Sequence, residues 1–125
     1  MRKTALVVDD NVLVRKLVCQ LIAQERDFEV CGQAENGREA IEKAQELRPD
    51  LIVMDLSMPV MNGLDAARVI KKMVPTVRIV MYSQYSADFG KQEARSAGIA
   101  ALVDKSEHVS SLIATARGLF VGTAA

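Results

Sequence analysis

Five short runs of β-branched and apolar residues alternate along the chain with longer stretches of helical periodicity. The runs cover residues 5–8, 28–31, 51–54, 78–81 and 101–103. This alternation is typical of repeated strand–helix–strand units, which build a parallel sheet. The runs at 5–8 and 51–54 are apolar throughout, as expected of strands that helices cover on both faces. The sequence therefore predicts an α/β fold in which helices wind around both faces of a parallel five-stranded sheet.

The spacing of apolar residues between these runs predicts helices at about 12–24, between the turn at 35–37 and Pro49, at 64–73, at 86–96 and after a cap at Ser106. Residues 86–96 include few large apolar side chains, so we expect this helix to pack weakly and to end at Gly98. The expected buried faces are Val14, Leu17, Val18, Leu21 and Ile22 in the first helix, Ala40, Ile41, Ala44 and Leu47 in the second, and Val109, Leu112, Ile113 and Ala116 in the last.

Length and charge limit the classes of function. The 125 residues suit one domain, expected to span 1–125, and 16 basic residues balance 16 acidic ones. No basic run favours direct nucleic-acid binding, and no apolar stretch is long enough for a membrane span or resembles a signal peptide. We therefore expect a cytoplasmic protein whose partners are proteins. Cys19 and Cys31 are expected to be reduced residues in or near the core, without chemistry of their own.

Polar residues follow four of the predicted strands. Asp9 and Asp10 follow the first, Asp55 the third, Ser83 the fourth, and Lys105 the fifth. With strand order 2-1-3-4-5, which is common in such doubly wound sheets, the ligand crevice lies beyond the carboxyl ends of strands one and three. The three carboxylates are therefore expected to converge.

Convergence of three carboxylates requires compensating positive charge. Two unit charges about 4 Å apart repel by roughly 4 kcal/mol at an effective dielectric near 20. Mg²⁺ suits such oxygen ligands, with Mn²⁺ as an alternative, and Lys105 adds a fixed charge. Ser83 supplies a hydroxyl for an incoming phosphoryl oxygen. These groups favour nucleophilic attack by Asp55 on a phosphoryl donor, which would form an acyl phosphate.

The residues Asp9-Asp10, Asp55, Ser57-Met58-Pro59, Gly63, Ser83, Gly98 and Lys105 resemble, in order and spacing, the signature of response-regulator receiver domains. The resemblance covers nearly the whole chain and implies a flavodoxin-like (βα)5 fold. It implies that Asp10, Asp55 and the main-chain carbonyl of Ser57 bind the metal directly, and that Asp9 acts through water.

The resemblance also implies partners. The donor would be a phosphohistidine on a sensor histidine kinase or a histidine phosphotransfer protein. Phosphorylation would switch the surface of the fourth helix, fifth strand and fifth helix, which would bind a downstream effector or attached output domain or form a dimer. No DNA-binding domain fits in the residues after Ala116, so we expect no output domain in this chain and no direct contact with nucleic acid.

Three positions depart from the usual receiver pattern. Leu102 stands where the family usually has an aromatic switch residue, and is expected to repack when Ser83 moves toward the phosphoryl group. Ser106 replaces a proline that often has a cis bond, so we expect a trans peptide here. Tyr85 is expected to overhang the pocket and to slow hydrolysis of the acyl phosphate.

A pseudo-receiver, which acts by binding alone without phosphorylation, shares this fold and is the main alternative. A phosphatase-type hydrolase is disfavoured because Ser57 stands where a second acid of a D-x-D motif is needed. A flavodoxin-like or dinucleotide carrier is disfavoured because Asp9-Asp10-Asn11 replaces a glycine-rich phosphate loop. His108 is expected to be a solvated or capping residue rather than a ligand or phosphodonor.

Overall fold

The computed structural model describes residues 2–84 and 90–120. In this part of the chain, five parallel strands form one sheet in the order β2-β1-β3-β4-β5. The strands are β1 (Lys3–Val8), β2 (Phe28–Ala34), β3 (Leu51–Met54), β4 (Arg78–Ser83) and β5 (Ala101–Asp104). The predicted α/β class, flavodoxin-like topology and strand order are confirmed.

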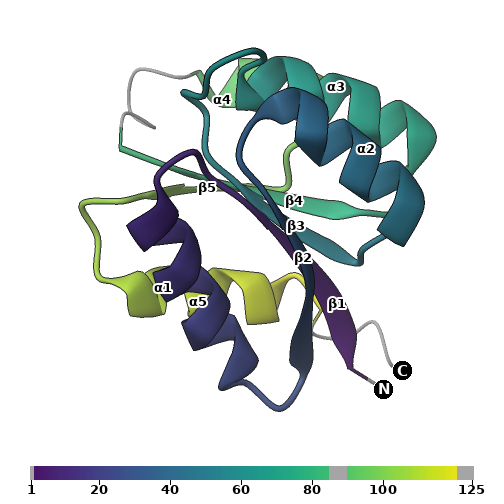
Figure 1. Cartoon of the computed structure of the whole chain (residues 1–125). Coiled ribbons are helices and arrows are strands. Elements are labelled where there is room, and N and C mark those ends of the chain that lie inside the picture. The colour runs from purple at the N-terminus through teal and green to yellow at the C-terminus, as the bar shows by residue number, and fades with distance from the viewer. Residues whose placement is uncertain (1, 85–89, 121–125) are drawn as a thin grey trace.

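Within the described residues, five helices cover the two faces of the sheet (Figure 1). Helices α2 (Gly37–Leu47), α3 (Gly63–Met73) and α4 (Lys91–Ser96) lie on one face, and α1 (Val12–Ala23) and α5 (Val109–Gly118) lie on the other. Because successive side chains of a strand point to opposite faces, β1 contributes Leu6 and Val8 to the core under α2 and α3. It contributes Ala5 and Val7 to the core under α1 and α5. The apolar strands are thus buried on both sides, as predicted.

Three helix starts use the asparagine caps that the sequence places after strands or turns. Asn11, Asn36 and Asn62 each accept a hydrogen bond from a main-chain N–H in the first turn of α1, α2 and α3. Gly98 adopts a φ of +82° after α4, in agreement with its predicted role as the end of that helix. The described helix α4 has Ala94 as its buried residue, which matches the weak apolar pattern predicted for it.

The start of the last helix was predicted wrongly. Its N-cap is His108, whose side chain accepts from Ser110 N, rather than Ser106. Ser106 N instead donates to Asp104 Oδ1 over 2.8 Å, and Glu107 N donates to the Asp104 carbonyl, so these residues close a turn before the helix begins. His108 is therefore the capping residue that the sequence suggested.

The predicted apolar face of the first helix was also partly wrong. Val18 and Ile22 are buried, one turn apart, whereas 47% of Leu17 is exposed. Successive helical residues are rotated by about 100°, so Leu17 lies at the side of the face that Val18 centres. Strands β2 and β4 run beyond their predicted ends to Ala34 and Ser83, because main-chain pairing continues through polar residues that interrupt the apolar runs. The predicted helix at 86–96 is described only from Lys91, and Tyr85 lies outside the described residues.

Candidate phosphoryl-acceptor site

Strand β1 delivers Asp9 and Asp10 to the carboxyl edge of the sheet. Asp9 N donates to the Ala34 carbonyl over 3.1 Å, which continues the pairing with β2 past the last residue of β1. The Asp9 carboxylate is buried and accepts from Asn11 N over 2.9 Å through Oδ1. Asp10 is exposed. The first acid is therefore held by the fold, while the second is accessible from solvent.

Strand β3 delivers Asp55 beside this pair. Asp55 N donates to the Val8 carbonyl over 3.0 Å, and 8% of the residue is exposed. The loop after Asp55 returns so closely that Gly63 N donates to the Leu56 carbonyl over 2.8 Å. A Cβ atom on Gly63 would overlap the main-chain oxygen of Asp55, so this position requires glycine. The close return fixes the loop that carries Ser57.

Ser83 and Lys105 come from the adjacent ends of β4 and β5. Lys105 N donates to the Ser83 carbonyl over 2.9 Å, and Ser83 is buried. The ammonium nitrogen of Lys105 lies 2.8 Å from Asp9 Oδ2 and 3.4 Å from Asp55 Oδ2. One cation therefore bridges two acids from different strands.

All the predicted site residues line one pocket of about 250 Å³. Its lining consists of Asp9, Asp10, Asn11, Asp55, Ser57, Ser83, Gln84 and Lys105. His108 is not among them and caps α5 instead. The pocket thus unites the buried carboxylate of Asp55, two further carboxylates, a hydroxyl and an ammonium group.

The acids present a donor set that fits a hard divalent cation. Carboxylate oxygens of Asp9, Asp10 and Asp55 all lie within 4.8 Å of one another. Mg²⁺ prefers oxygen ligands, keeps several waters and is usually bound through one or two carboxylates. The cluster also carries more negative charge than Lys105 alone offsets. The residues therefore fit Mg²⁺ by both donor chemistry and charge.

Burial and neighbouring charges shift the pKa of two titrating groups in the site. Burial raises the pKa of the Asp55 carboxyl above its usual range, and the charge of Asp9 adds to this rise while Lys105 opposes it. Burial by itself would lower the pKa of Lys105, but its hydrogen bond to Asp9 and the charges of Asp55 and Asp9 together raise it. Lys105 is therefore a fixed positive charge at neutral pH.

Two contacts of the site were not predicted from the sequence. Arg15 donates through Nη1 to the Asp9 carbonyl over 2.8 Å and through Nε to Gln33 over 3.0 Å, which ties α1 to the ends of β1 and β2. The Lys105 ammonium group lies 5.8 Å from the centre of the Tyr82 ring. Nothing in the local pattern distinguishes Arg15 from an ordinary helical arginine. Tyr82 precedes Ser83, and its position at the strand end was the available signal.

Of the three positions that depart from the usual receiver pattern, Leu102 and Ser106 lie within the described residues. Leu102 is half-buried and packs against the core on the α4 face of the sheet. No cis peptide bond occurs in the described residues, which agrees with the trans peptide expected at Ser106.

Comparison with known proteins assigns this architecture to one family. The family model described as the response regulator receiver domain matches residues 5–117. The chemotaxis protein CheY of Thermotoga maritima is 42% identical over 98 residues, which cover 78% of this chain and 81% of that protein. A protein-glutamate methylesterase/protein-glutamine glutaminase of a Nocardioides species is 41% identical over 109 residues, covering 86% of this chain and 30% of that protein.

Solved structures agree with this assignment. The response regulator domain of Thermotoga maritima CheB is 36% identical with a TM-score of 0.79, covering 84% of this chain and 79% of that one. A LuxR-family two-component response regulator from an Aurantimonas species is 28% identical with a TM-score of 0.88, covering 98% and 87%. The chain spans between about a quarter and a half of the first curated relatives that it matches. Within the described residues, no helix has the length and apolar character that a membrane crossing requires.

Proposed function

The chain belongs to the response regulator receiver family, a family of two-component signalling domains, and on this premise we propose that it accepts a phosphoryl group on Asp55. The observation that carries the proposal is the bridge from Lys105 to both Asp9 and Asp55 inside a pocket that also contains Ser83. The carboxylate that we propose as the nucleophile thus shares a pocket with a fixed cation and a hydroxyl. The matched region is the receiver part of its relatives, and residues 1–125 are proposed to form one receiver domain.

The proposed reaction transfers the phosphoryl group from a phosphohistidine. A carboxylate oxygen of Asp55 attacks phosphorus in line as the phosphorus–nitrogen bond of the donor breaks. The electron pair of that bond stays on the donor's imidazole, which takes up a proton from water. The product is an aspartyl phosphate on this chain and a free histidine on the donor.

Ser83 and Lys105 would stabilise the charge on the transferred group. The Ser83 hydroxyl donates to one phosphoryl oxygen, and the Lys105 ammonium group moves from Asp9 toward another. Both residues stand at adjacent strand ends and are linked through the main chain, so little reorganisation is needed. Transfer of a phosphoryl group depends mainly on such positioning and charge compensation.

Receiver domains bind Mg²⁺ at a cluster of aspartates, and this chain has such a group. We propose that Asp10, Asp55 and the Ser57 carbonyl hold Mg²⁺ directly, with Mn²⁺ as a substitute, and that Asp9 acts through water. When bound, the ion would offset the negative charge of the carboxylates and the phosphoryl oxygens. Asp10 is the exposed member of the cluster, which suits the entry of an ion from solvent.

The proposed partners follow from the reaction and from the relatives. A sensor histidine kinase or a histidine phosphotransfer protein, in the cytoplasm, would supply the phosphoryl group. Phosphorylation would alter the surface formed by α4, β5 and α5, to which a downstream effector, an attached output domain or a second phosphorylated copy would bind. Relatives named as methylesterases and as the response regulator protein VraR extend well beyond the matched region.

The test is incubation of the protein with acetyl phosphate and Mg²⁺, followed by intact-mass measurement. We expect the wild type to gain one phosphoryl group. Asp55→Asn should gain none, and chelation of Mg²⁺ should prevent the gain. Glu46→Gln, an exposed carboxylate substitution on α2, serves as the matched control and should be phosphorylated normally.

A folded wild-type protein that gains no phosphoryl group from acetyl phosphate, and that does not respond to beryllofluoride, would contradict this proposal. That result would instead support a pseudo-receiver that acts by binding alone.

A further inference from the structure

Arg15, near the start of α1, holds the end of the strand that carries the first two acids. Its Nη1 donates to the Asp9 carbonyl over 2.8 Å, and its Nε donates to Gln33 Oε1, near the end of β2, over 3.0 Å. A guanidinium group is planar and presents its N–H donors in a rigid arrangement, so two bonds to different elements fix its position. One side chain thus ties together α1, the Asp9 peptide group and β2.

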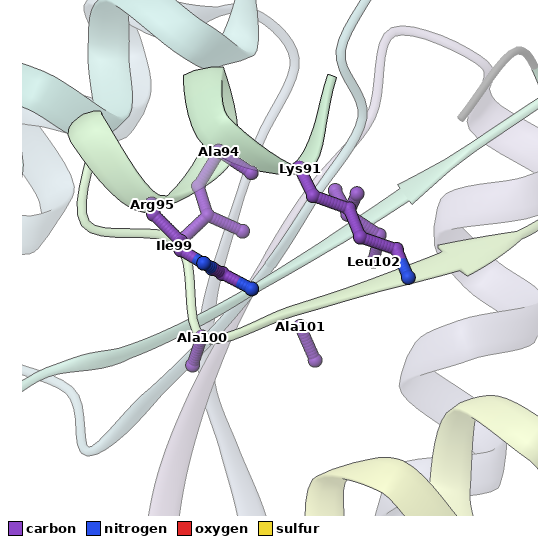
Figure 2. A pocket seen from close by; sticks show the side chains of 7 residues that line it. All are labelled: Lys91, Ala94, Arg95, Ile99, Ala100, Ala101 and Leu102. Atoms are coloured by element: carbon purple, nitrogen blue, oxygen red, sulfur yellow. The ribbon is translucent and has the colours of Figure 1, made fainter. Parts of the chain in front are cut away.

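Arg95 on α4 shows how a helical arginine without such bonds behaves. Figure 2 shows its side chain extending from the helix toward β5, at the pocket of about 230 Å³ between these two elements. Arg95 is exposed and forms no ion pair with any residue that the structure describes. Arg15 is half-buried and makes two directed hydrogen bonds, which distinguish it from a solvated arginine.

The Asp9 carbonyl lies just beyond the point where β1 and β2 stop pairing. The last paired residues are Val8 and Ala34, and the Asp9 N–H makes one further bond, to the Ala34 carbonyl, over 3.1 Å. A carbonyl at the end of a ladder needs a donor from a side chain or from water. Arg15 supplies that donor, so both main-chain polar groups of Asp9 are held. The peptide group between Asp9 and Asp10 therefore has a fixed orientation.

Asp10 depends on this peptide group for its position. Its side chain is exposed and forms no hydrogen bond or ion pair with any residue that the structure describes. Asp9 and Asp55, by contrast, are both held by Lys105. A carboxylate oxygen of Asp10 nevertheless lies within 4.8 Å of an oxygen of each of the other two acids. The main chain that precedes Asp10 must therefore direct its carboxylate into the cluster.

The charge of Arg15 opposes metal binding, which separates a positioning role from an electrostatic one. Both groups that it binds, a carbonyl and a side-chain amide, are neutral. A cation beside the cluster repels a divalent metal ion. If only its charge mattered, loss of Arg15 would tighten the binding of Mg²⁺. If its bonds position the acids, the same loss would weaken that binding.

We propose that Arg15 is a positioning residue for the metal and acceptor site, because its bond to the Asp9 carbonyl directs the Asp10 carboxylate toward the ion. Arg15 does not line the acceptor pocket, so it acts through the Asp9 peptide group, with Gln33 as the anchor of its guanidinium group. This inference rests on the proposed function, since it concerns the Mg²⁺ that Asp10 and Asp55 are proposed to bind. Groups that orient metal ligands in this indirect way typically contribute 10- to 100-fold to metal affinity.

The first test is calorimetric titration of the metal-free protein with MgCl₂. Arg15→Met should raise the dissociation constant for Mg²⁺ by about tenfold. Gln33→Met removes the anchor of the guanidinium group without a change of charge, and should raise the constant by about threefold. Arg38→Met is the matched control, since it removes an exposed arginine in the first turn of α2 that does not line the acceptor pocket. It should leave Mg²⁺ binding unchanged or slightly tighter.

The second test is the rate of phosphorylation by acetyl phosphate at increasing concentrations of Mg²⁺. Arg15→Met should raise the Mg²⁺ concentration at the half-maximal rate by about the same factor as the dissociation constant. Its rate at saturating Mg²⁺ should stay within about twofold of the wild type, because the bound ion then holds Asp10 in place. General damage to the fold would instead lower the rate at every Mg²⁺ concentration. Far-UV circular dichroism in EDTA establishes that each variant is folded.

Several outcomes would overturn the inference. Unchanged or tighter Mg²⁺ binding by folded Arg15→Met would assign Arg15 no positioning role, as would equal weakening by Arg38→Met. A lower rate at saturating Mg²⁺ with an unchanged half-maximal concentration would also overturn it. If Arg15→Met does not fold, Gln33→Met decides, because Gln33 is exposed and its loss should be tolerated. Wild-type affinity in Gln33→Met would then overturn the inference.

Failure of this inference is distinguishable from failure of the proposed function. A wild-type protein that binds Mg²⁺ and gains one phosphoryl group, with Arg15→Met identical to it, would remove only the inference. A wild-type protein that neither binds Mg²⁺ nor gains a phosphoryl group would remove the proposed function.

Discussion

The ammonium group of Lys105 lies 2.8 Å from Asp9 Oδ2, although 96 residues separate the two positions in the chain. The contact joins the end of β5 to the end of β1 across the intervening strands β3 and β4. It is largely removed from solvent, with 18% of the Lys105 side chain and 5% of the Asp9 side chain exposed. In the metal-free protein, this ion pair compensates part of the charge of the acid cluster.

Lys105→Ala should destabilise the metal-free protein. The substitution leaves the buried Asp9 carboxylate without its cation and beside Asp55, and we expect a loss of about 1–3 kcal/mol in the free energy of unfolding. Urea unfolding followed by circular dichroism measures this change. Adding Asp9→Asn to Lys105→Ala should recover part of the loss. Equal stability of Lys105→Ala and the wild type would contradict the role of this pair.

Asp10→Asn should have opposite effects without and with Mg²⁺. Without metal, it removes one of three carboxylates that lie within 4.8 Å of one another, and the melting temperature should rise, by the equivalent of about 1 kcal/mol for so exposed a group. With saturating Mg²⁺, the wild type should gain stability by binding, whereas the variant should gain much less. Thermal unfolding in EDTA and in MgCl₂ tests both statements.

Glu46→Gln on α2 is the control for Asp10→Asn, because it removes an exposed carboxylate that does not line the pocket of the acid cluster. It should leave the response to Mg²⁺ unchanged. An Asp10→Asn variant that Mg²⁺ stabilises as much as it stabilises the wild type would exclude Asp10 from the metal site.

The strands near the site were predictable because the apolar runs in the sequence coincide with the segments that the fold buries. Strand β3 has the predicted bounds, Leu51–Met54, since an uninterrupted apolar run lies between Pro49 and Asp55. The convergence of Asp9, Asp55 and Lys105 was also predictable. In a parallel sheet the carboxyl ends of all strands meet at one edge, so polar residues at those ends are brought together.

Features that depend on competing hydrogen bonds were not predictable. Serine is a preferred N-cap residue, yet His108 caps α5, because Asp104 accepts from the Ser106 N–H and holds Ser106 in the preceding turn. The contact of Arg15 with the Asp9 carbonyl depends on the angle at which α1 leaves β1, which no local pattern encodes.

Val60→Gly should stabilise the protein. Val60 has a φ of +70° in the loop between β3 and α3, and 75% of it is exposed. A β-branched residue in this conformation costs about 1–2 kcal/mol, and its side chain gains little burial in return. The greater chain entropy of glycine in the unfolded state offsets part of this gain. We expect a net increase of about 0.5–1 kcal/mol in the free energy of unfolding.

Val69→Gly is the matched control for this change. Val69 is an exposed valine within helix α3, where glycine should lower stability by several tenths of a kcal/mol to about 1 kcal/mol. The two substitutions remove the same side chain, so opposite signs in urea unfolding would isolate the backbone strain at Val60. Destabilisation by both would show that Val60 is not strained.

Cys19 and Cys31 should react slowly with iodoacetamide in the folded protein. Both are half-buried free thiols, and burial raises the pKa of each above its ordinary value of 9.0, although Arg15 partly opposes the rise at Cys19. Because the thiolate is the reacting form, alkylation near pH 8 should be slower in buffer than in urea. Equal rates of alkylation in buffer and in urea would contradict the raised pKa of the two thiols.

The raised pKa of the two thiols also predicts how the stability of the protein depends on pH. A raised pKa in the folded state means that folding favours the protonated thiol, so its contribution to stability is fully present below the unfolded pKa near 9.0. That contribution is lost as the pH rises through the folded pKa. Above pH 9, the free energy of unfolding should therefore fall more steeply for the wild type than for Cys19→Ala/Cys31→Ala. Taking the difference between the two proteins removes the effects of lysines and tyrosines, which titrate in the same range. Parallel curves for the two proteins in urea unfolding at successive pH values would show that the cysteines do not contribute.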